Sequence, residues 1–173
     1  GAILAGWRSG VVLARWLAFV DADGAVSAAE VARVLGLVCE TGKAAGYFAS
    51  RNREAGKTIR RRWPRGQLGC VFAWLAGRLL GLKTHDSQCG FKVVEREWFR
   101  RIDARVRELG FCFDLDVWLA LREQGAKVAE VPVDWQERAG GKLKLWRDGA
   151  GMLRQLWCLR KKYQVGKSGG VGH

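Results

Sequence analysis

The feature that most constrains this chain is a short apolar strand that ends in two carboxylates. Residues 17–20 are all apolar, and Asp21 and Asp23 follow them directly. An apolar run of this length is typical of a strand buried in a parallel sheet, and side chains two residues apart leave it on the same side. Open α/β sheets bind their ligands beyond the carboxyl ends of such strands. The pattern therefore predicts an α/β fold with a binding site around Asp21 and Asp23.

Two neighbouring carboxylates are suited to a divalent cation. Mg²⁺ and Mn²⁺ prefer hard oxygen ligands, and a few carboxylates often hold them together with phosphate oxygens and water. The sequence Asp-x-Asp-Gly is also typical of a turn in which an Asp side chain caps the backbone. On residues 21–24 alone, a metal site and a plain turn both remain open.

The positive charge of the chain predicts an anionic partner. Its 173 residues include 30 Lys or Arg and 17 Asp or Glu, which gives a net charge of +13. Such a balance favours nucleic acid, anionic lipid or phosphorylated small molecules. Residues 51–65, here called the arginine loop, contain seven Lys or Arg and one Glu. This loop is either a solvated face or an anion site.

The five cysteines are scattered and lack the CxxC or Cys/His spacing of a zinc site. Their odd number and spacing favour reduced thiols over a disulfide framework.

Periodicity and capping signals predict alternating helices and strands. Ser27 and Glu30 form a capping box at the start of a helix over residues 27–40, which Gly42 ends. Asp114 is the predicted N-cap of another helix, with Gly125 just beyond its end. The other expected elements are a helical opening over residues 1–14, strands at 45–50, 90–94 and 128–133, and helices at 68–82, 95–109 and 146–163. A proline within the last strand, Pro132, predicts an edge or strand-end position.

The helix at residues 146–163 is expected to be amphipathic and basic. Met152, Leu156, Leu159 and Tyr163 share one face, and arginines and lysines lie elsewhere. This pattern fits a helix on an anionic membrane surface, and it equally fits a helix packed on the protein's own core. The Gly-rich tail over residues 164–173 is expected to be disordered.

Several short blocks, in order along the chain, resemble the inverting family 2 glycosyltransferases of the GT-A fold. The likeness is to the branch that glycosylates polyprenyl phosphates, which includes the dolichyl-phosphate β-glucosyltransferases. The matching blocks are residues 21–25, 49–51, 86–92, 113–116, 128–135 and 141–143. A lone Asp-x-Asp is a weak signal, whereas this series is specific.

The resemblance implies a partial GT-A fold, a Rossmann-like mixed sheet flanked by helices. Family members open with a strand that carries a Pro-x-Tyr-Asn-Glu-like motif and a further strand with an Asp, and these nucleotide-binding strands have no counterpart here. Residues 1–145 are therefore expected to be the C-terminal portion of the glycosyltransferase domain. Residues 146–163 would form the basic helix, and residues 164–173 the tail.

The resemblance also implies a donor site. Asp21 and Asp23 would bind Mg²⁺ or Mn²⁺ against the diphosphate of a sugar nucleotide. Arg138 and Lys142 match the positions that close over this diphosphate.

On the acceptor side, Arg51 and Arg65 match the family's clamp on the acceptor phosphate. Asp86 is the carboxylate expected nearest the acceptor, and Asp116 is the second catalytic candidate. For both carboxylates, helix capping or the orientation of an arginine is the alternative.

The expected function is the transfer of a hexose from a sugar nucleotide to a polyprenyl (dolichyl-type) phosphate. Glucose from UDP-glucose is favoured, and GDP-mannose or a saccharide acceptor is the alternative. The expected location is the cytoplasmic face of a membrane with an anionic surface, reached peripherally or through segments outside this chain. A basic nucleic-acid-binding module or an inactive fragment are alternatives of another class. Nucleic acid is the less expected partner, because a carboxylate pair beside the arginines would repel its backbone.

Overall fold

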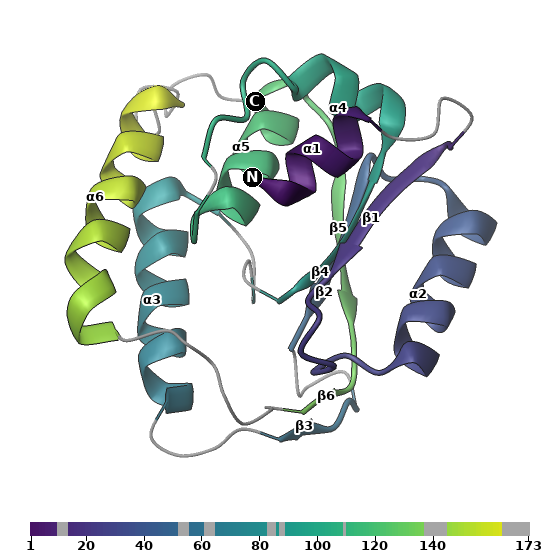
Figure 1. The fold of residues 1–173 in the computed structure, drawn as a ribbon, viewed down its shortest axis with the longest axis horizontal. Coiled ribbons are helices and arrows are strands. Elements are labelled where there is room, and N and C mark those ends of the chain that lie inside the picture. Colours follow the sequence, from purple (N-terminus) through teal and green to yellow (C-terminus); the bar gives the residue numbers. More distant parts are fainter. Residues whose placement is uncertain are drawn as a thin grey trace, which may run out of the picture.

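The computed structural model describes residues 1–9, 14–51, 56–60, 65–82, 86, 89–108, 110–136 and 145–163. Helices cover both faces of a mixed four-stranded sheet in these ranges (Figure 1). The strands of the sheet are β1 (Trp16–Val20), β2 (Gly46–Ser50), β4 (Phe91–Glu95) and β5 (Val128–Pro132). A second, two-stranded parallel sheet pairs β3 (Ile59–Arg60) with β6 (Trp135–Gln136).

The order of the main sheet is β1-β4-β2-β5. Strand β4 runs antiparallel to both of its neighbours, and β2 and β5 are parallel. Consequently β1, β2 and β5 all point in one direction. The predicted edge position of the strand with Pro132 is confirmed. The prediction that residues 17–20 lie in a parallel sheet, buried on both faces, is wrong: β1 is an edge strand, antiparallel to β4, and Val20 is 44% exposed.

One helix covers one face of the sheet, and the remaining helices lie on the other (Figure 1). Helix α2 (Ala28–Thr41) packs on the first face. Helices α1 (Ala2–Arg8) and α5 (Phe113–Glu123) share the second core, to which α4 (Arg96–Ile102) also contributes. Helices α3 (Arg65–Leu80) and α6 (Leu145–Lys162) pack side by side outside them.

The alternation of side chains along the strands creates these two cores. In β2, Tyr47 joins the core under α2, whereas Phe48 joins the opposite core. In β4, Phe91 and Val93 face α2. The residue between them, Lys92, therefore projects a charge toward the second core, where it is 1% exposed.

The predicted helix signals are largely confirmed at α2 and α5. The Ser27 hydroxyl accepts a hydrogen bond from the Glu30 amide at 3.2 Å, and Gly42 ends α2 at a φ of 52°. Gly125 follows α5 at a φ of 73°. Asp114, however, is not the N-cap: the cap position is Cys112, and Asp114 lies within the first turn of α5.

The helix predicted over residues 95–109 is shorter in the structure, because α4 ends at Ile102. The backbone amides of Arg107 and Glu108 donate to the Asp116 carboxylate at 2.8 and 3.0 Å. A side chain from α5 thus takes the amides that a longer helix would bond to its own carbonyls.

The apolar face of α6 packs on the protein's own core. Met152, Leu156 and Leu159 are at most 4% exposed. Of the two alternatives for this face, packing on the protein's own core is confirmed, and contact with a membrane is not. Within the described ranges, no helix has the length and apolar character needed to cross a bilayer. The tail from residue 164 lies outside the described residues, and the predicted division of the chain at residue 145 stays a prediction.

Candidate functional site

The strand directions bring several predicted site residues to one edge of the sheet. The carboxyl ends of β1, β2 and β5 meet there with the amino end of β4. Asp21 follows β1, Arg51 follows β2, and Asp86 and Gly90 precede β4. Because β4 is antiparallel, the segment leading into it reaches the same edge as the segments leaving the other three strands.

Asp21 lies against the backbone of Gly90. Its amide donates to the Gly90 carbonyl at 2.7 Å, and a Cβ added to Gly90 would overlap the Asp21 side chain. The glycine is therefore required by the close approach of this carboxylate. Asp23 caps its own turn, because its Oδ1 accepts the Ala25 amide at 2.9 Å. The turn interpretation thus holds for Asp23, and it is compatible with a ligand role for the pair.

Negative charge accumulates around Asp21. The pKa of this carboxyl is raised, first because its contact with the protein removes water, and then because the Asp23 and Asp114 carboxylates lie nearby. A divalent cation would offset this repulsion. No group of three or more His, Cys, Asp or Glu side chains within the described ranges could hold a metal ion. Two carboxylates instead suit a cation that takes its other ligands from phosphate and water.

Lys92 and Asp114 form a buried ion pair near Asp21 that the sequence interpretation missed. The Lys92 ammonium lies 2.5 Å from Asp114 Oδ2, and it also donates to the Cys89 carbonyl. It lies 5.7 Å from the ring centre of Phe19. Burial is the main cause that raises the pKa of Asp114. The sequence does hold a signal for this pair, because Lys92 lies between apolar residues of a predicted strand. A charge buried in a strand needs a partner of opposite sign.

Arg51 and Asp86, predicted for separate roles, form one ion pair. The Arg51 Nη2 donates to Asp86 Oδ1 at 2.8 Å, its Nε donates to Oδ2, and its backbone amide donates to Oδ2 at 3.0 Å. The Asp86 side chain is 5% exposed. The Arg51 guanidinium also lies 5.1 Å from the ring centre of Trp135. These contacts favour the alternative in which Asp86 orients an arginine.

Asp116 lies away from this edge, in a network that joins α5 to α6. It is 0% exposed, and it accepts from Lys162 Nζ at 2.7 Å and from the Tyr163 hydroxyl at 2.6 Å. The same carboxylate accepts the two amides after α4. The structure does not bring Asp116 together with Asp21 or Arg51. Its catalytic role stays a prediction, and its contacts are those of a residue that fixes helices.

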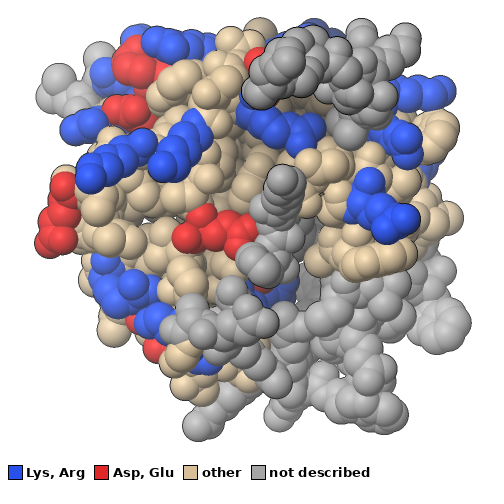
Figure 2. Space-filling model, turned by 180° about the vertical axis from the view of Figure 1, so that it is seen from behind, with Lys and Arg blue, Asp and Glu red and all other residues tan. Residues whose placement is uncertain are grey.

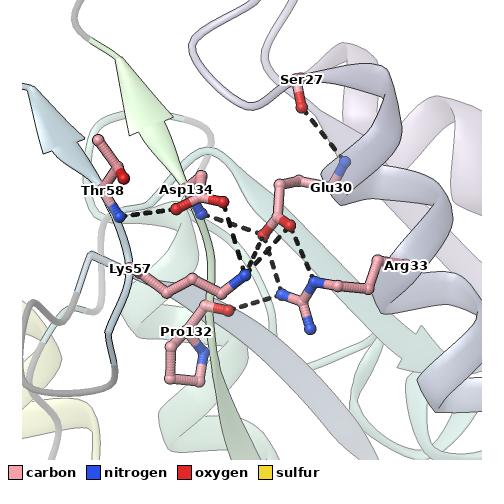
Figure 3. Close-up of polar contacts among 7 residues, drawn as sticks. All are labelled: Ser27, Glu30, Arg33, Lys57, Thr58, Pro132 and Asp134. Atoms are coloured by element: carbon pink, nitrogen blue, oxygen red, sulfur yellow. Dashed lines mark hydrogen bonds and ion pairs between the residues drawn. The ribbon is translucent and has the colours of Figure 1, made fainter.

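Glu30 is the centre of a second polar network, shown in Figure 3. Its carboxylate accepts from Arg33 Nε at 2.9 Å, from Lys57 Nζ at 3.2 Å and from the Asp134 amide at 3.0 Å. These donors, the Arg33 guanidinium first among them, lower the pKa of Glu30 to about 2. The side chain of the predicted capping box therefore reaches across to other elements.

The network continues through Asp134 to the small sheet. Asp134 Oδ1 accepts the Thr58 amide at 2.7 Å, and its Oδ2 lies 3.6 Å from Lys57 Nζ (Figure 3). The Thr58 carbonyl accepts the Trp135 amide at 3.0 Å. The helix after the Asp pair, the middle of the arginine loop and the chain after β5 are thus joined. These segments carry the predicted donor and acceptor residues or, in the case of α2, directly follow them.

Three predicted site residues are not placed by the structure. Arg65 begins α3, but its side chain is not described, and Arg138 and Lys142 lie outside the described residues. Figure 2 shows one face of the molecule, on which basic side chains gather mainly toward the margins and a compact acidic patch lies near the centre.

Comparison with curated proteins identifies relatives over most of the chain. Dolichyl-phosphate beta-glucosyltransferase of Saccharomyces cerevisiae is 28% identical over 162 residues, which cover 86% of this chain and 48% of that protein. Polyprenol monophosphomannose synthase of Mycolicibacterium smegmatis is 32% identical over 128 residues, which cover 73% of this chain and 47% of that protein. The chain thus spans about half the length of these relatives. No family model matches it.

Solved structures share the fold at low sequence identity. Glucosyl-3-phosphoglycerate synthase from Mycobacterium tuberculosis, in complex with uridine diphosphate, superposes with a TM-score of 0.64 at 15% identity. The match covers 97% of this chain and 56% of that one. A complex of the same synthase with Mn²⁺, uridine diphosphate and glucosyl-3-phosphoglycerate gives a TM-score of 0.63.

Proposed function

Because the chain belongs to the family 2 glycosyltransferases with the GT-A fold, we propose that it is the part of such an enzyme that transfers a hexose to a polyprenyl phosphate. The donor is a sugar nucleotide, and the reaction inverts the anomeric carbon. The relatives that support this proposal are named as glucosyl- and mannosyltransferases of dolichyl or polyprenyl phosphates.

The observation that carries the proposal is the meeting of opposite charges at one sheet edge. The Asp21 carboxylate lies over Gly90, and Arg51 is held by Asp86 at the same edge. A carboxylate pair suits a cation on a diphosphate, and a fixed guanidinium suits a second phosphate. Donor and acceptor phosphates could therefore be held side by side without mutual repulsion.

Asp21 and Asp23 are the residues that would hold Mg²⁺ or Mn²⁺. The negative charge gathered around Asp21 fits a divalent cation, and the bound neighbour with Mn²⁺ and uridine diphosphate supports this choice. When bound, the cation supplies positive charge to a departing diphosphate. The Lys92–Asp114 ion pair would support the Asp21 side chain from the core side. Arg138 and Lys142 are proposed to close over the diphosphate.

The acceptor chemistry needs no general base. A phosphomonoester has a second pKa near 6 and is therefore ionised near neutral pH. Arg51, together with Arg65, is proposed to orient its oxygen toward the anomeric carbon, and Asp86 positions Arg51. Positioning and charge neutralisation then account for the rate.

Glucose from UDP-glucose is the favoured donor, because several of the curated relatives are glucosyltransferases. Mannose from GDP-mannose is the second candidate, favoured by the mycobacterial relative. The proposed location is the cytoplasmic face of a membrane, where a polyprenyl phosphate is held.

The test, made in the full-length enzyme, is transfer of labelled sugar from UDP-glucose or GDP-mannose to a polyprenyl phosphate, with and without Mn²⁺. Transfer from one donor only, lost on chelation, is the expected result. Arg51→Lys should lower use of the lipid phosphate at least ~10-fold, because a lysine cannot grip two oxygens in one plane.

Asp103→Asn is the matched control for Asp21→Asn. Asp103 forms an exposed pair with Arg8 at 2.8 Å, and neither residue belongs to the proposed site. Asp21→Asn should abolish transfer and Asp103→Asn should leave it intact. Full transfer by the Asp21 variant would contradict the donor assignment.

A further inference from the structure

Trp135 is the aromatic residue over which the guanidinium of Arg51 lies. The centre of its ring is 5.1 Å from the Arg51 Cζ. The same guanidinium donates to the Asp86 carboxylate through its Nε and Nη2. Two groups of different kind therefore restrain one cation, because the carboxylate accepts its N–H bonds and the aromatic ring lies against it.

Backbone hydrogen bonds fix the position of Trp135 itself. Strand β6 lies with β3 beyond the carboxyl end of β5 (Figure 1). The Trp135 amide donates to the Thr58 carbonyl at 3.0 Å, and the amide of the next residue, Gln136, donates to the Ala25 carbonyl at 2.9 Å. The Trp135 side chain is partly buried against the core under α2. The ring is thus carried by a short strand that is bonded to two other segments.

One of these segments is the turn that carries the carboxylate pair. The Ala25 amide donates to Asp23 Oδ1 at 2.9 Å, and the Ala25 carbonyl accepts from Gln136. A continuous series of contacts therefore runs from the proposed donor turn, through Ala25 and β6, to the ring of Trp135 and the guanidinium of Arg51. The contacts relate the position of the proposed acceptor cation to that of the proposed donor carboxylates.

We propose that Trp135 is a positioning residue for the acceptor phosphate, which fixes the Arg51 guanidinium relative to the turn of the Asp pair. This role rests on the proposed function, because that function gives Arg51 a phosphate to bind. Arginine grips phosphate through N–H groups in one plane, so a displaced guanidinium weakens both bonds at once. A tryptophan face is the aromatic surface that attracts a cation best. A cation held in place beforehand also loses less freedom when the phosphate arrives.

A second arginine–tryptophan contact, at the other end of the sheet, provides a matched control. The Arg15 guanidinium lies 5.3 Å from the ring centre of Trp16, and Trp16 is also partly buried against the core under α2. Trp16 begins β1, whereas the Asp pair follows the end of that strand. The two tryptophans are thus alike in their cation contact and in the core that they join, and only Trp135 lies at the edge of the candidate site.

The test measures kcat and KM of the full-length enzyme for the polyprenyl phosphate and for the sugar nucleotide. Trp135→Leu should lower kcat/KM for the polyprenyl phosphate about 10-fold and change the KM of the sugar nucleotide less than about 2-fold. Trp135→Phe keeps an aromatic face and should lose less than about 3-fold. Trp16→Leu should change either substrate's kcat/KM less than about 2-fold, because its ring holds no residue of the site.

A double-mutant cycle with Arg51→Lys determines whether Trp135 acts through the arginine. Lysine keeps the charge but lacks the planar group that stacks on a ring. Trp135→Leu should therefore cost less than about 3-fold in the Arg51→Lys enzyme, against about 10-fold in the wild type. Far-UV circular dichroism and thermal unfolding confirm that each variant is folded. Trp135→Met, which also lacks a ring, replaces Trp135→Leu if the leucine variant does not fold.

Equal losses for Trp135→Leu and Trp16→Leu would overturn the proposal, because the effect would then be one of core packing. The same loss in the wild-type and Arg51→Lys enzymes would also overturn it, as would an effect mainly on the KM of the sugar nucleotide. Wild-type transfer with unchanged use of the lipid by Trp135→Leu would count against the role of Trp135 only. Absence of transfer by the wild-type enzyme from either donor would contradict the proposed function, and this role with it.

Discussion

Asp114 and Asp116 lie two residues apart on α5, and their surroundings differ sharply. Asp116 is fully buried and accepts four groups: two backbone amides, a lysine and a tyrosine. Asp114 accepts from Lys92, and burial raises its pKa. A carboxylate that accepts a full set of hydrogen bonds, like Asp116, fixes structure. A buried carboxylate with one charged partner, like Asp114, adds negative charge to its surroundings.

The same contrast separates two polar networks of the molecule from the candidate site. Glu30 and Asp116 are centres of satisfied networks that hold loops and helices in place. Around Asp21, by comparison, burial first and then the Asp23 and Asp114 carboxylates raise the pKa of Asp21, although the charges of Lys92 and Arg51 act in the opposite direction. Negative charge that is only partly compensated therefore distinguishes the candidate site from the polar networks that support it.

The largest expected effect is a loss of stability on substitution of Asp116, the carboxylate whose hydrogen bonds are all made. Asp116→Asn should lower the free energy of unfolding by about 3–5 kcal/mol, because it leaves the Lys162 ammonium without its carboxylate in a buried network. Urea unfolding measures this change. The control, Asp103→Asn, breaks an exposed ion pair and should cost less than about 1 kcal/mol. Equal losses of unfolding free energy for the Asp116 and Asp103 variants would show that the buried network stabilises the protein no more than an exposed ion pair does.

The second effect concerns the pH dependence of stability. The folded pKa of Glu30, about 2, lies below its ordinary value of 4.5, so ionised Glu30 stabilises the fold above pH 4.5. This contribution, about 2–3 kcal/mol, should fade as the pH falls from 4.5 to 2.

Glu30→Gln should therefore lower stability at neutral pH and flatten the pH profile between 4.5 and 2. Thermal unfolding across this window measures it. Glu40→Gln, an exposed change at the other end of α2, should shift stability by less than about 0.5 kcal/mol. An unchanged profile for the Glu30 variant would show that the network of Figure 3 does not bear on stability.

A third variant acts at the candidate site. In Gly90→Ala, the new methyl group must displace the Asp21 side chain, at a cost of about 1–3 kcal/mol. Mn²⁺ affinity should fall roughly 10-fold or more, because the carboxylate moves. Titration of Mn²⁺ followed by electron paramagnetic resonance measures this loss.

Gly36→Ala is the matched control, since a Cβ there meets open space on α2. It should stabilise the helix by about 0.5–1 kcal/mol and leave Mn²⁺ binding unchanged. Wild-type Mn²⁺ affinity in the Gly90 variant would contradict the assignment of Asp21.

The smallest expected effect is that of Asp114→Asn. The amide oxygen can still accept from Lys92, and the loss of the Asp114 charge relieves repulsion on the Asp21 carboxylate, a gain that Asp116→Asn does not bring. Stability should therefore fall by only about 1–2 kcal/mol, less than for Asp116→Asn. A larger loss than that of the Asp116 variant, in the same urea titration, would reverse the comparison.

Local signals were accurate where neighbouring residues decide the outcome. The start and end of α2 at Ser27 and Gly42 depend on groups within a few residues, and so does the glycine after α5. The strand with Pro132 was correctly placed at an edge, because proline cannot donate to a second neighbour. The family-level prediction, based on ordered blocks, is supported by the relatives and the shared fold.

Predictions failed where a distant group intervened. The helix over residues 95–109 ends early because Asp116 takes the amides after it. Asp86 and Arg51, 35 residues apart, form one ion pair, which is the alternative that the sequence left open for Asp86 without identifying the arginine. Lys92 received no role, because its partner Asp114 lies on another element.

By itself, the sequence determined the element types, the carboxylate pair after β1 and the family, because hydrophobic periodicity, capping residues and motif order are local properties of a chain. Only the tertiary structure decided that β1 is an antiparallel edge strand, that Asp21 lies over Gly90 and that Asp86 holds Arg51. The directions of the strands set these contacts, since the antiparallel β4 brings its leading segment to the edge where the other strands end.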